Sequence, residues 1–257
     1  MERSATARHL HFHDLPRRLM AMENRWPAGS STGWHSHPRA QLLYATEGVM
    51  IVHSEAGSWV VPPNRALWMV AGLRHNVIMS GDVLIRTAYV DAEAITRLPR
   101  ASCVINVSPL LRELLVEAVR IPASGKLSPR DRRLIALLID ELRVSSTVAL
   151  HLPMPGDARL RRICDALIER PDDRKGASAW AETIGVGERT FQRMFTKGTG
   201  MSFSRWREQA RLLAALTAIA RGDKVIDVAL GCGYSSHSAF TAMFRRHFGV
   251  PPSAFYR

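Results

Sequence analysis

The sequence predicts an α+β protein of two domains, in which a domain of short strands precedes an all-helical domain. Three observations lead to this prediction. Residues 1–100 contain short apolar or alternating segments separated by turn residues, a pattern typical of a β-sandwich or small β-barrel. Residues 101–150 change to helical periodicity. The last hundred residues contain one helical pattern twice, and 257 residues are enough for two separate cores.

Five segments of residues 1–100 are predicted to be strands. Turn signals separate them, among them Glu47-Gly48, Pro62-Pro63-Asn64 and Ser80-Gly81-Asp82. Because glycine, proline and asparagine favour turns, each such cluster is expected to end a strand. The predicted strands are residues 41–46, 49–53, 58–61, 66–70 and 83–90.

Residues 101–150 are predicted to form a helical spacer with two helices. Ser108-Pro109 and Ser128-Pro129 each place a capping hydroxyl before a proline at the first helical position. The first helix is expected to end at Arg120, and the second to span residues 129–143. The second helix has one apolar stripe. The stripe predicts either a core contact within the chain or an interface between two copies, and the second alternative would make the protein a homodimer. The stripe is Leu134, Leu137, Leu138 and Leu142.

Residues 151–157 are rich in proline and glycine and are predicted to be a linker. The domain after the linker, residues 158–257, is expected to be entirely helical. It is predicted to contain two three-helix units that share a long central helix. The predicted helices are residues 159–170, 178–184, 188–197, 202–221, 224–230 and 236–248.

The repeated pattern is the spacing of a helix-turn-helix. A small alanine lets two helices approach, a glycine four residues later makes the turn, and an apolar residue locks the second helix onto the first. Two such motifs in tandem predict a protein that binds double-stranded DNA. The first copy is Ala181, Gly185 and Phe191, and the second, with one extra turn residue, is Ala229, Gly233 and Phe240.

The charge distribution agrees with DNA binding. Residues 1–157 hold 18 Lys and Arg against 14 Asp and Glu, a net charge of +4, whereas residues 158–257 hold 17 against 9, a net charge of +8. The basic excess therefore coincides with the repeated motif, as binding to phosphates requires. Most of the positive charge is arginine, which suits paired contacts with phosphate and guanine.

Cysteine content and hydropathy indicate a cytoplasmic protein without a membrane segment. Three scattered cysteines, Cys103, Cys164 and Cys232, are too few for a disulfide framework. The first residues lack the apolar core of a signal peptide, and no run of 18 apolar residues occurs.

The length of the central helix suggests how two motifs in one chain bind DNA. About 20 residues at a rise of roughly 1.5 Å per residue give about 30 Å. Successive major grooves on one face of B-DNA are about 34 Å apart. We therefore expect the two recognition helices to enter adjacent major grooves.

The C-terminal hundred residues resemble the AraC/XylS family of bacterial transcriptional regulators. The resemblance rests on the repeated motif together with 189–195 (RTFQRMF), 203–206 (FSRW), 225–229 (VIDVA) and 244–249 (FRRHFG). It implies a protein that binds a promoter, alters the recruitment of RNA polymerase, and associates with the nucleoid when bound.

Helical geometry and the resemblance together assign residues to DNA contact. In the first recognition helix, the outward positions opposite Phe191 are Glu188, Arg189, Gln192 and Arg193, of which the resemblance implies that the last three contact bases or nearby phosphates. The matching positions of the second helix are His237, Ser238, Thr241 and Ala242. Some family members have arginine where this chain has Ala242. The second helix is therefore expected to contribute fewer base contacts and more phosphate contacts, through Ser236, Arg245 and Arg246.

The N-terminal region resembles the cupins. Gly29, His35, His37, Gln41 and Gly48 follow the first cupin motif, with Gln41 where cupins have glutamate. Further along, Gly72 and His75 match the second motif, whereas Asn64 and Val70 replace its glycine and proline. The resemblance covers roughly residues 20–90 and implies a cupin-like β-barrel that acts as a sensor domain.

Three interpretations of this histidine cluster remain open. His35 and His37 alternate on one segment and so point to one side, and metal-binding cupins hold a divalent ion at the positions of His35, His37, Gln41 and His75. The second interpretation is a metal-free pocket for a small-molecule effector. The third is that the histidines are core residues without a ligand. The pocket would combine the four residues with Trp34, Arg39, Trp59 and Trp68.

Two classes of function follow. One is a DNA-binding regulator controlled by a ligand in the N-terminal domain. The other is a cupin-type metal-dependent enzyme that carries a DNA-binding domain. The missing carboxylate at Gln41 disfavours the enzyme, as does the absence of a nucleophile elbow, a phosphate loop or a dinucleotide fingerprint in the sequence. The sequence therefore predicts a regulator that is not an enzyme.

Overall fold

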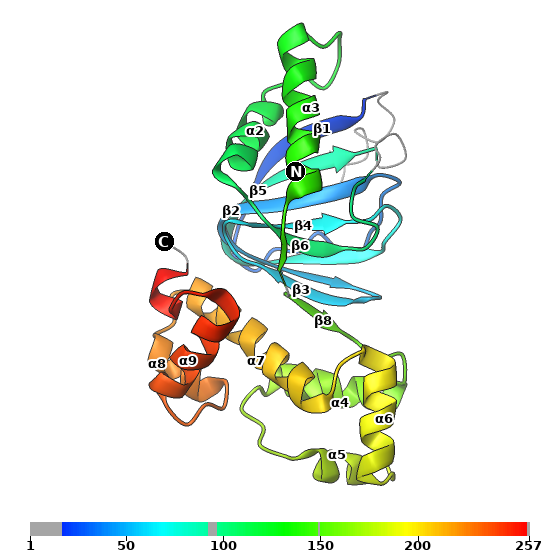
Figure 1. Cartoon of the computed structure of the whole chain (residues 1–257), viewed down its shortest axis with the longest axis vertical. Helices are drawn as coiled ribbons and strands as arrows, with labels where there is room; N and C mark the ends of the chain where they lie inside the picture. The colour runs from blue at the N-terminus through cyan, green and yellow to red at the C-terminus, as the bar shows by residue number, and fades with distance from the viewer. Residues whose placement is uncertain (1–16, 92–96, 149, 256–257) are drawn as a thin grey trace, which may run out of the picture. The chain divides into compact units, whose positions relative to one another are not determined.

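The computed structural model describes residues 17–91, 97–148 and 150–255 (Figure 1). It divides into two compact units. The N-terminal unit contains the residues up to Glu55 together with Val61–His151, and the C-terminal unit contains Ala56–Val60 together with Leu152–Arg257.

The N-terminal half is built on an antiparallel sheet. The main path of this sheet runs β1-β5-β2-β4-β6-β7. β3 and β8 pair with each other, and most of their residues belong to the C-terminal unit. The strands are β1 (Leu19–Trp26), β2 (Ala40–Ser54), β3 (Gly57–Val61), β4 (Arg65–Met69), β5 (His75–Val90), β6 (Cys103–Asn106), β7 (Thr147–Val148) and β8 (His151–Pro153).

Two predicted turns are wrong, because β2 and β5 continue through them. The two strands pair from Ala40 opposite Val90 to Ser54 opposite His75, with register shifts on either side of Glu47. Gly48 has a φ of +70°, and a Cβ there would lie 2.4 Å from the carbonyl oxygen of Asp82. The glycines at these positions therefore allow an irregularity in a long ribbon, as in a β-bulge, and do not end the strands.

Two helices cover one face of the sheet (Figure 1). They are α2 (Pro109–Val119) and α3 (Pro129–Val144), and both begin at the predicted serine caps: Ser108 accepts a hydrogen bond from the amide of Leu111, and Ser128 forms a capping box. Alternate residues of β2 face these helices, and their core includes Leu42, Tyr44 and Trp68. Because successive residues of a strand point to opposite faces, the remaining residues of β2, such as Gln41 and Leu43, face the other side of the sheet.

The predicted apolar stripe of α3 is partly wrong. Leu134, Leu138 and Leu142 lie in the core, but Leu137 is 43% exposed. Ile135 and Ile139 are buried in its place. The buried arc runs from Leu134 toward Ile139 in the direction of helical rotation, and Leu137 projects on the other side of Leu134.

The predicted helical spacer and linker also contribute strands. β6 and β7 lie within residues 101–150, and β6 pairs with β4. β8 occupies the first three residues of the predicted linker. These short strands have no strong periodicity of their own and depend on pairing with distant strands.

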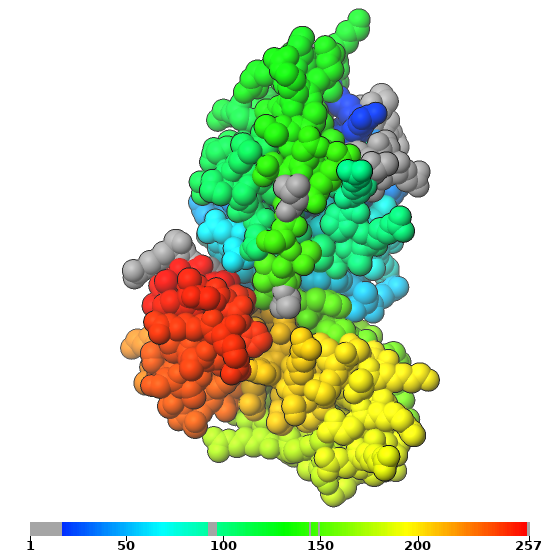
Figure 2. All heavy atoms as spheres, viewed as in Figure 1, coloured from blue at the N-terminus to red at the C-terminus, as the bar shows by residue number. Residues whose placement is uncertain are grey.

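The C-terminal unit contains the six predicted helices. In the space-filling view, the segments that contain α6 (yellow) and α9 (red) form separate lobes (Figure 2). The helices are α4 (Ala158–Glu169), α5 (Ala177–Thr183), α6 (Glu188–Thr199), α7 (Phe203–Ala220), α8 (Val225–Gly231) and α9 (His237–Phe248), followed by a 3-10 turn, η2 (Pro252–Ala254).

The three cysteines are free thiols. Cys164 and Cys232 are buried, and burial raises the pKa of the Cys232 thiol to about 11. Among the described residues, no helix combines the length and the apolar character that crossing a bilayer would need.

Candidate DNA-binding surface and histidine site

The two helix-turn-helix motifs have the same backbone geometry. Ala181 and Ala229 are buried at the helix contact, and Gly185 and Gly233 take φ values of +68° and +77°. The two recognition helices, α6 and α9, each have 12 residues and end at a glycine in the left-handed conformation. The repeated residues therefore fix the repeated backbone, as their spacing predicts.

In the first motif, α6 buries its aromatic face and exposes its charged face. Phe191 and Phe195 are fully buried, and their rings pack with each other and with Phe203 of α7. Glu188, Arg189 and Arg193 are exposed, and Gln192 is half-buried. The described residues include no hydrogen-bond or ion-pair partner for either arginine side chain. Both guanidiniums are therefore available to an external acceptor such as guanine or phosphate.

In the second motif, α9 presents fewer polar groups. His237 and Ser238 are exposed, but Ser236 uses its hydroxyl as the helix cap by accepting from the amide of Ala239 at 3.1 Å. The hydroxyl of Thr241, which was expected at the DNA surface, is buried and has no partner among the described residues. The exposed position equivalent to Arg193 is Ala242.

The two arginines near the end of α9 differ from each other. Arg245 is exposed, and no described residue pairs with its side chain. Arg246 donates to Oε1 of Glu208 on α7 at 2.6 Å, and Nε2 of His247 lies 3.6 Å from the same oxygen. Arg246 was expected to contact phosphate, but its charge is compensated within the protein.

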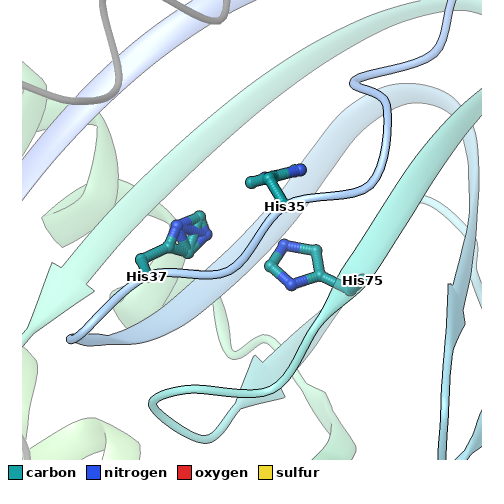
Figure 3. A group of neighbouring side chains, drawn as sticks. All are labelled: His35, His37 and His75. Atoms are coloured by element: carbon teal, nitrogen blue, oxygen red, sulfur yellow. The ribbon is translucent and has the colours of Figure 1, made fainter.

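His35, His37 and His75 come together in the N-terminal unit (Figure 3). One candidate ligand atom from each ring can be chosen so that all three lie within 4.8 Å of one another. His35 precedes β2 and His75 opens β5, and their backbones form an antiparallel bridge. This bridge brings together two segments that are 40 residues apart in the sequence.

Backbone carbonyls select the tautomer of two of these rings. Nδ1 of His35 lies 2.8 Å from the carbonyl oxygen of Gly33, and Nδ1 of His75 lies 2.8 Å from that of Leu73. A carbonyl only accepts, so in the neutral form of each ring Nδ1 carries the hydrogen and Nε2 has the lone pair.

Nε2 of His75 is a buried acceptor without a donor. His75 is 1% exposed, and no described group bonds its Nε2. Burial lowers the pKa of His75 to about 4, while the backbone hydrogen bond to Leu73 acts in the opposite direction and the neighbouring His35 ring acts in the same direction as burial. The ring is therefore neutral at pH 7, and its orphaned lone pair is chemically suited to a metal ion.

Gln41, which was expected among the metal ligands, instead supports a histidine. Its Oε1 lies 2.9 Å from Nε2 of His37, and its Nε2 lies 3.5 Å from the hydroxyl of Tyr89. Because Oε1 accepts from His37, the amide orients the imidazole. The replacement of a carboxylate by an amide therefore leaves three imidazoles as the candidate ligands.

A small cavity adjoins His35 and Gln41. Its volume is about 20 Å³, enough for about one water molecule. Alternate residues of β2 and β5 line this cavity. Thr87 and Tyr89 are among them, and neither was predicted from the sequence. The lining residues are Asn24, Trp26, Thr32, His35, Gln41, Leu43, Val77, Ile85, Thr87 and Tyr89.

The other expected pocket residues do not line this cavity. Trp34 is 49% exposed, and Arg39 donates to the carbonyl oxygen of Arg17. Trp68 pairs with Leu42, lies in the core under α2 and α3, and donates to the carbonyl oxygen of Pro99. Trp59 is buried but is not part of the cavity wall. The expected aromatic pocket is therefore not assembled.

An antiparallel sheet unit joined to a tandem helix-turn-helix defines a transcriptional regulator with a ligand-binding domain. The model of the AraC-like ligand binding domain matches residues 25–183, and that of the helix-turn-helix domain matches residues 180–257. The chain therefore belongs to the AraC family of helix-turn-helix transcriptional regulators. The fold class and the regulatory function predicted from the sequence are confirmed.

The chain is similar to two named regulators and to one solved structure. The chain is 32% identical over 221 residues to the HTH-type transcriptional regulator NimR of Escherichia coli K12, covering 86% of this chain and 81% of NimR. It is 38% identical over 103 residues to the HTH-type transcriptional regulator RipA of Corynebacterium glutamicum, covering 40% of this chain and 31% of RipA. The crystal structure of ToxT from Vibrio cholerae matches 93% of this chain and 98% of its own at 9% identity, with a TM-score of 0.39.

Proposed function

We propose that this regulator binds a two-part operator, in which α6 reads bases and α9 mainly holds the DNA backbone. The observation that carries this proposal is the pair of equivalent recognition helices connected through α7. Its 18 residues rise by about 27 Å, close to the distance between adjacent major grooves. Arg189 and Arg193 supply base-reading donors on α6, with Gln192 beside them, whereas α9 offers His237, Ser238 and Arg245.

Footprinting of the full chain on DNA selected from random duplexes tests this proposal. We expect two protected segments about one helical turn apart for each DNA-binding domain. A single protected segment, unaffected by changes in α9, would contradict it.

The regulator is proposed to act in the cytoplasm, on promoter DNA of the nucleoid, by altering RNA polymerase recruitment. We assign effector binding to residues 1–100, a pairing surface between two copies to residues 101–150, the linker to residues 151–157 and DNA binding to residues 158–257. Sedimentation of the full chain with and without operator DNA tests the homodimer. Transcription in vitro from an operator-bearing promoter tests the effect on polymerase.

We also propose that the effector site is a metal site formed by His35, His37 and His75. Imidazoles suit divalent Zn, Cu, Fe and Ni, and the orphaned Nε2 of His75 fits such an ion. Histidine ligands usually donate their second nitrogen to a carbonyl, as His35 and His75 do. The cavity beside His35, of about 20 Å³, holds a water more readily than an organic molecule. When bound, the ion would supply a positive charge that links the segment before β2 to the start of β5.

Metal binding to the full chain tests the site. Titration calorimetry with Zn²⁺, Ni²⁺ and Co²⁺ is expected to give one ion per chain. His75→Ala should abolish this binding, and His247→Ala, which removes an imidazole from the C-terminal unit, should not. Equal binding by both variants would contradict the site. If the ion binds but leaves operator affinity unchanged, it is not the effector, and a small organic molecule becomes the stronger candidate.

The same preparation separates the regulator from the alternative of a metal-dependent enzyme. We propose that the chain is not an enzyme, since its relatives are regulators and the support of His37 by Gln41 takes the place of a carboxylate ligand. Stoichiometric iron with oxygen consumption would favour the enzyme.

A further inference from the structure

Two arginines of α7 hold the segment that leads into the first helix-turn-helix. Arg211 donates from Nε to the carbonyl oxygen of Pro171 and from Nη2 to that of Asp173, both at 2.8 Å. One turn earlier, Arg207 donates to the carbonyl oxygen of Lys175 at 2.7 Å. Hydrogen bonds from a charged donor are stronger than neutral ones, and the planar guanidinium gives them a fixed direction. The segment between α4 and α5 is therefore attached to α7 through its backbone.

The guanidinium of Arg211 also packs against the turn of the second helix-turn-helix. A Cβ built on Gly233 would lie 2.9 Å from Nη2 of Arg211 and 3.0 Å from Cα of Asp172. The turn between α8 and α9 thus has van der Waals contact with both the arginine and the segment that the arginine holds. The three atoms nearest to that Cβ belong to Arg211 and Asp172, and none belongs to Arg207. Arg211 lies at the point where the two motifs meet.

We propose that Arg211 is a positioning residue that sets the spacing and rotation at which α6 and α9 meet DNA. The central helix fixes the distance between the motifs along its own axis. The rotation of each motif about that axis depends on contacts at the side of the helix. Arg211 makes such contacts with both motifs, through the segment before α5 and the turn at Gly233. This inference rests on the proposed two-part operator. It makes Arg211 a determinant of operator spacing that does not itself touch a base.

The test measures the affinity of the full chain for operator duplexes that differ only in half-site spacing. The operator is the sequence selected from random duplexes, and one or two base pairs are added or removed between its halves. Wild type is expected to lose at least about tenfold in affinity when the spacing changes, because simultaneous engagement depends on geometry. The Arg211→Gln variant is expected to bind the duplex with the selected spacing about as weakly as the duplexes with altered spacing. Its affinity for a duplex with a single half-site is expected to be unchanged.

Matched variants separate positioning from charge and from folding. Arg207→Gln removes a similar arginine and should keep the spacing preference. Arg211→Lys keeps the charge but not the paired geometry, and should not restore the preference. If Arg211→Gln fails to fold, Arg211→Lys gives the same readout, because a single ammonium cannot reproduce the paired hydrogen bonds to Pro171 and Asp173.

The outcomes distinguish two failures. If wild type itself shows no spacing preference, the two-part operator is wrong. If wild type has the preference and folded Arg211→Gln or Arg211→Lys keeps it, the role of Arg211 is overturned. Equal loss by Arg211→Gln on every spacing and on a single half-site also overturns it, because that result describes a phosphate contact.

Discussion

The two helix-turn-helix motifs share a scaffold and differ on the surface available to DNA. Their first helices, α5 and α8, have seven residues each, and their recognition helices have 12 each. On α6, two arginines have no partner within the described protein. On α9, Thr241 turns its hydroxyl inward and Arg246 pairs with Glu208. The repeat therefore preserves what packing requires, while the outward positions have diverged.

Truncation of the aromatic cores should show that the scaffolds are equivalent. Phe191 and Phe240 are both fully buried. Replacing either with alanine is expected to destabilise the C-terminal unit by about 3–5 kcal/mol, because a large cavity is left behind. Urea denaturation of each variant measures this loss. A much smaller loss for one of them would show that the two scaffolds are not equally packed.

Base reading should differ between the motifs. Arg193→Ala is expected to cost about 1–3 kcal/mol on the selected operator and to relax specificity at the base pair it contacts. Ala242→Arg, at the matching position of α9, should create a new preference for guanine there. Binding titrations on operator and random DNA measure both effects. Equal losses on the two DNAs from Arg193→Ala would reject its role in reading bases.

Phosphate binding should differ between neighbouring arginines of α9. Arg245→Ala is expected to weaken binding to all sequences and to reduce the slope of log K against log salt by about one. Arg246→Ala should make the slope less shallow than Arg245→Ala does, because Glu208 already neutralises the charge of Arg246. Glu208→Gln should make the slope steeper, because it frees that charge for phosphate. Affinities measured across salt concentrations test this order. An Arg246 effect as large as that of Arg245 would mean that the ion pair opens on DNA.

The smallest expected difference lies at the helix caps. Ser236 caps α9 through its side chain, whereas Gly187 begins α6 without a side-chain hydrogen bond. Ser236→Ala is expected to cost about 1 kcal/mol, and Gly187→Ser to change stability by only a few tenths. Thermal or urea unfolding measures both, and a loss from Gly187→Ser as large as that from Ser236→Ala would contradict the difference in capping.

Local sequence patterns predicted the helices well and the sites less well. The serine caps of α2 and α3, and the spacing of alanine, glycine and phenylalanine in the two motifs, act within one or two helical turns. Their outcome is therefore set by neighbours in the chain. The strands were harder to bound, because Gly48 and Gly81 have the composition of turns but lie inside continuous β2 and β5. A glycine ends a strand or bends it depending on which strand lies opposite.

The sequence by itself determined that this protein combines a sheet domain with a tandem helix-turn-helix, because periodicity, caps and glycine positions are local properties. Only the tertiary structure decided which functional side chains are available. Glu208 accepts a hydrogen bond from Arg246, which is 38 residues away in the sequence. Gln41 accepts a hydrogen bond from His37 instead of serving beside it as a metal ligand. Trp68 faces the helices because it pairs with Leu42. Each of these outcomes depends on contacts between distant segments, whose register and packing no local pattern contains.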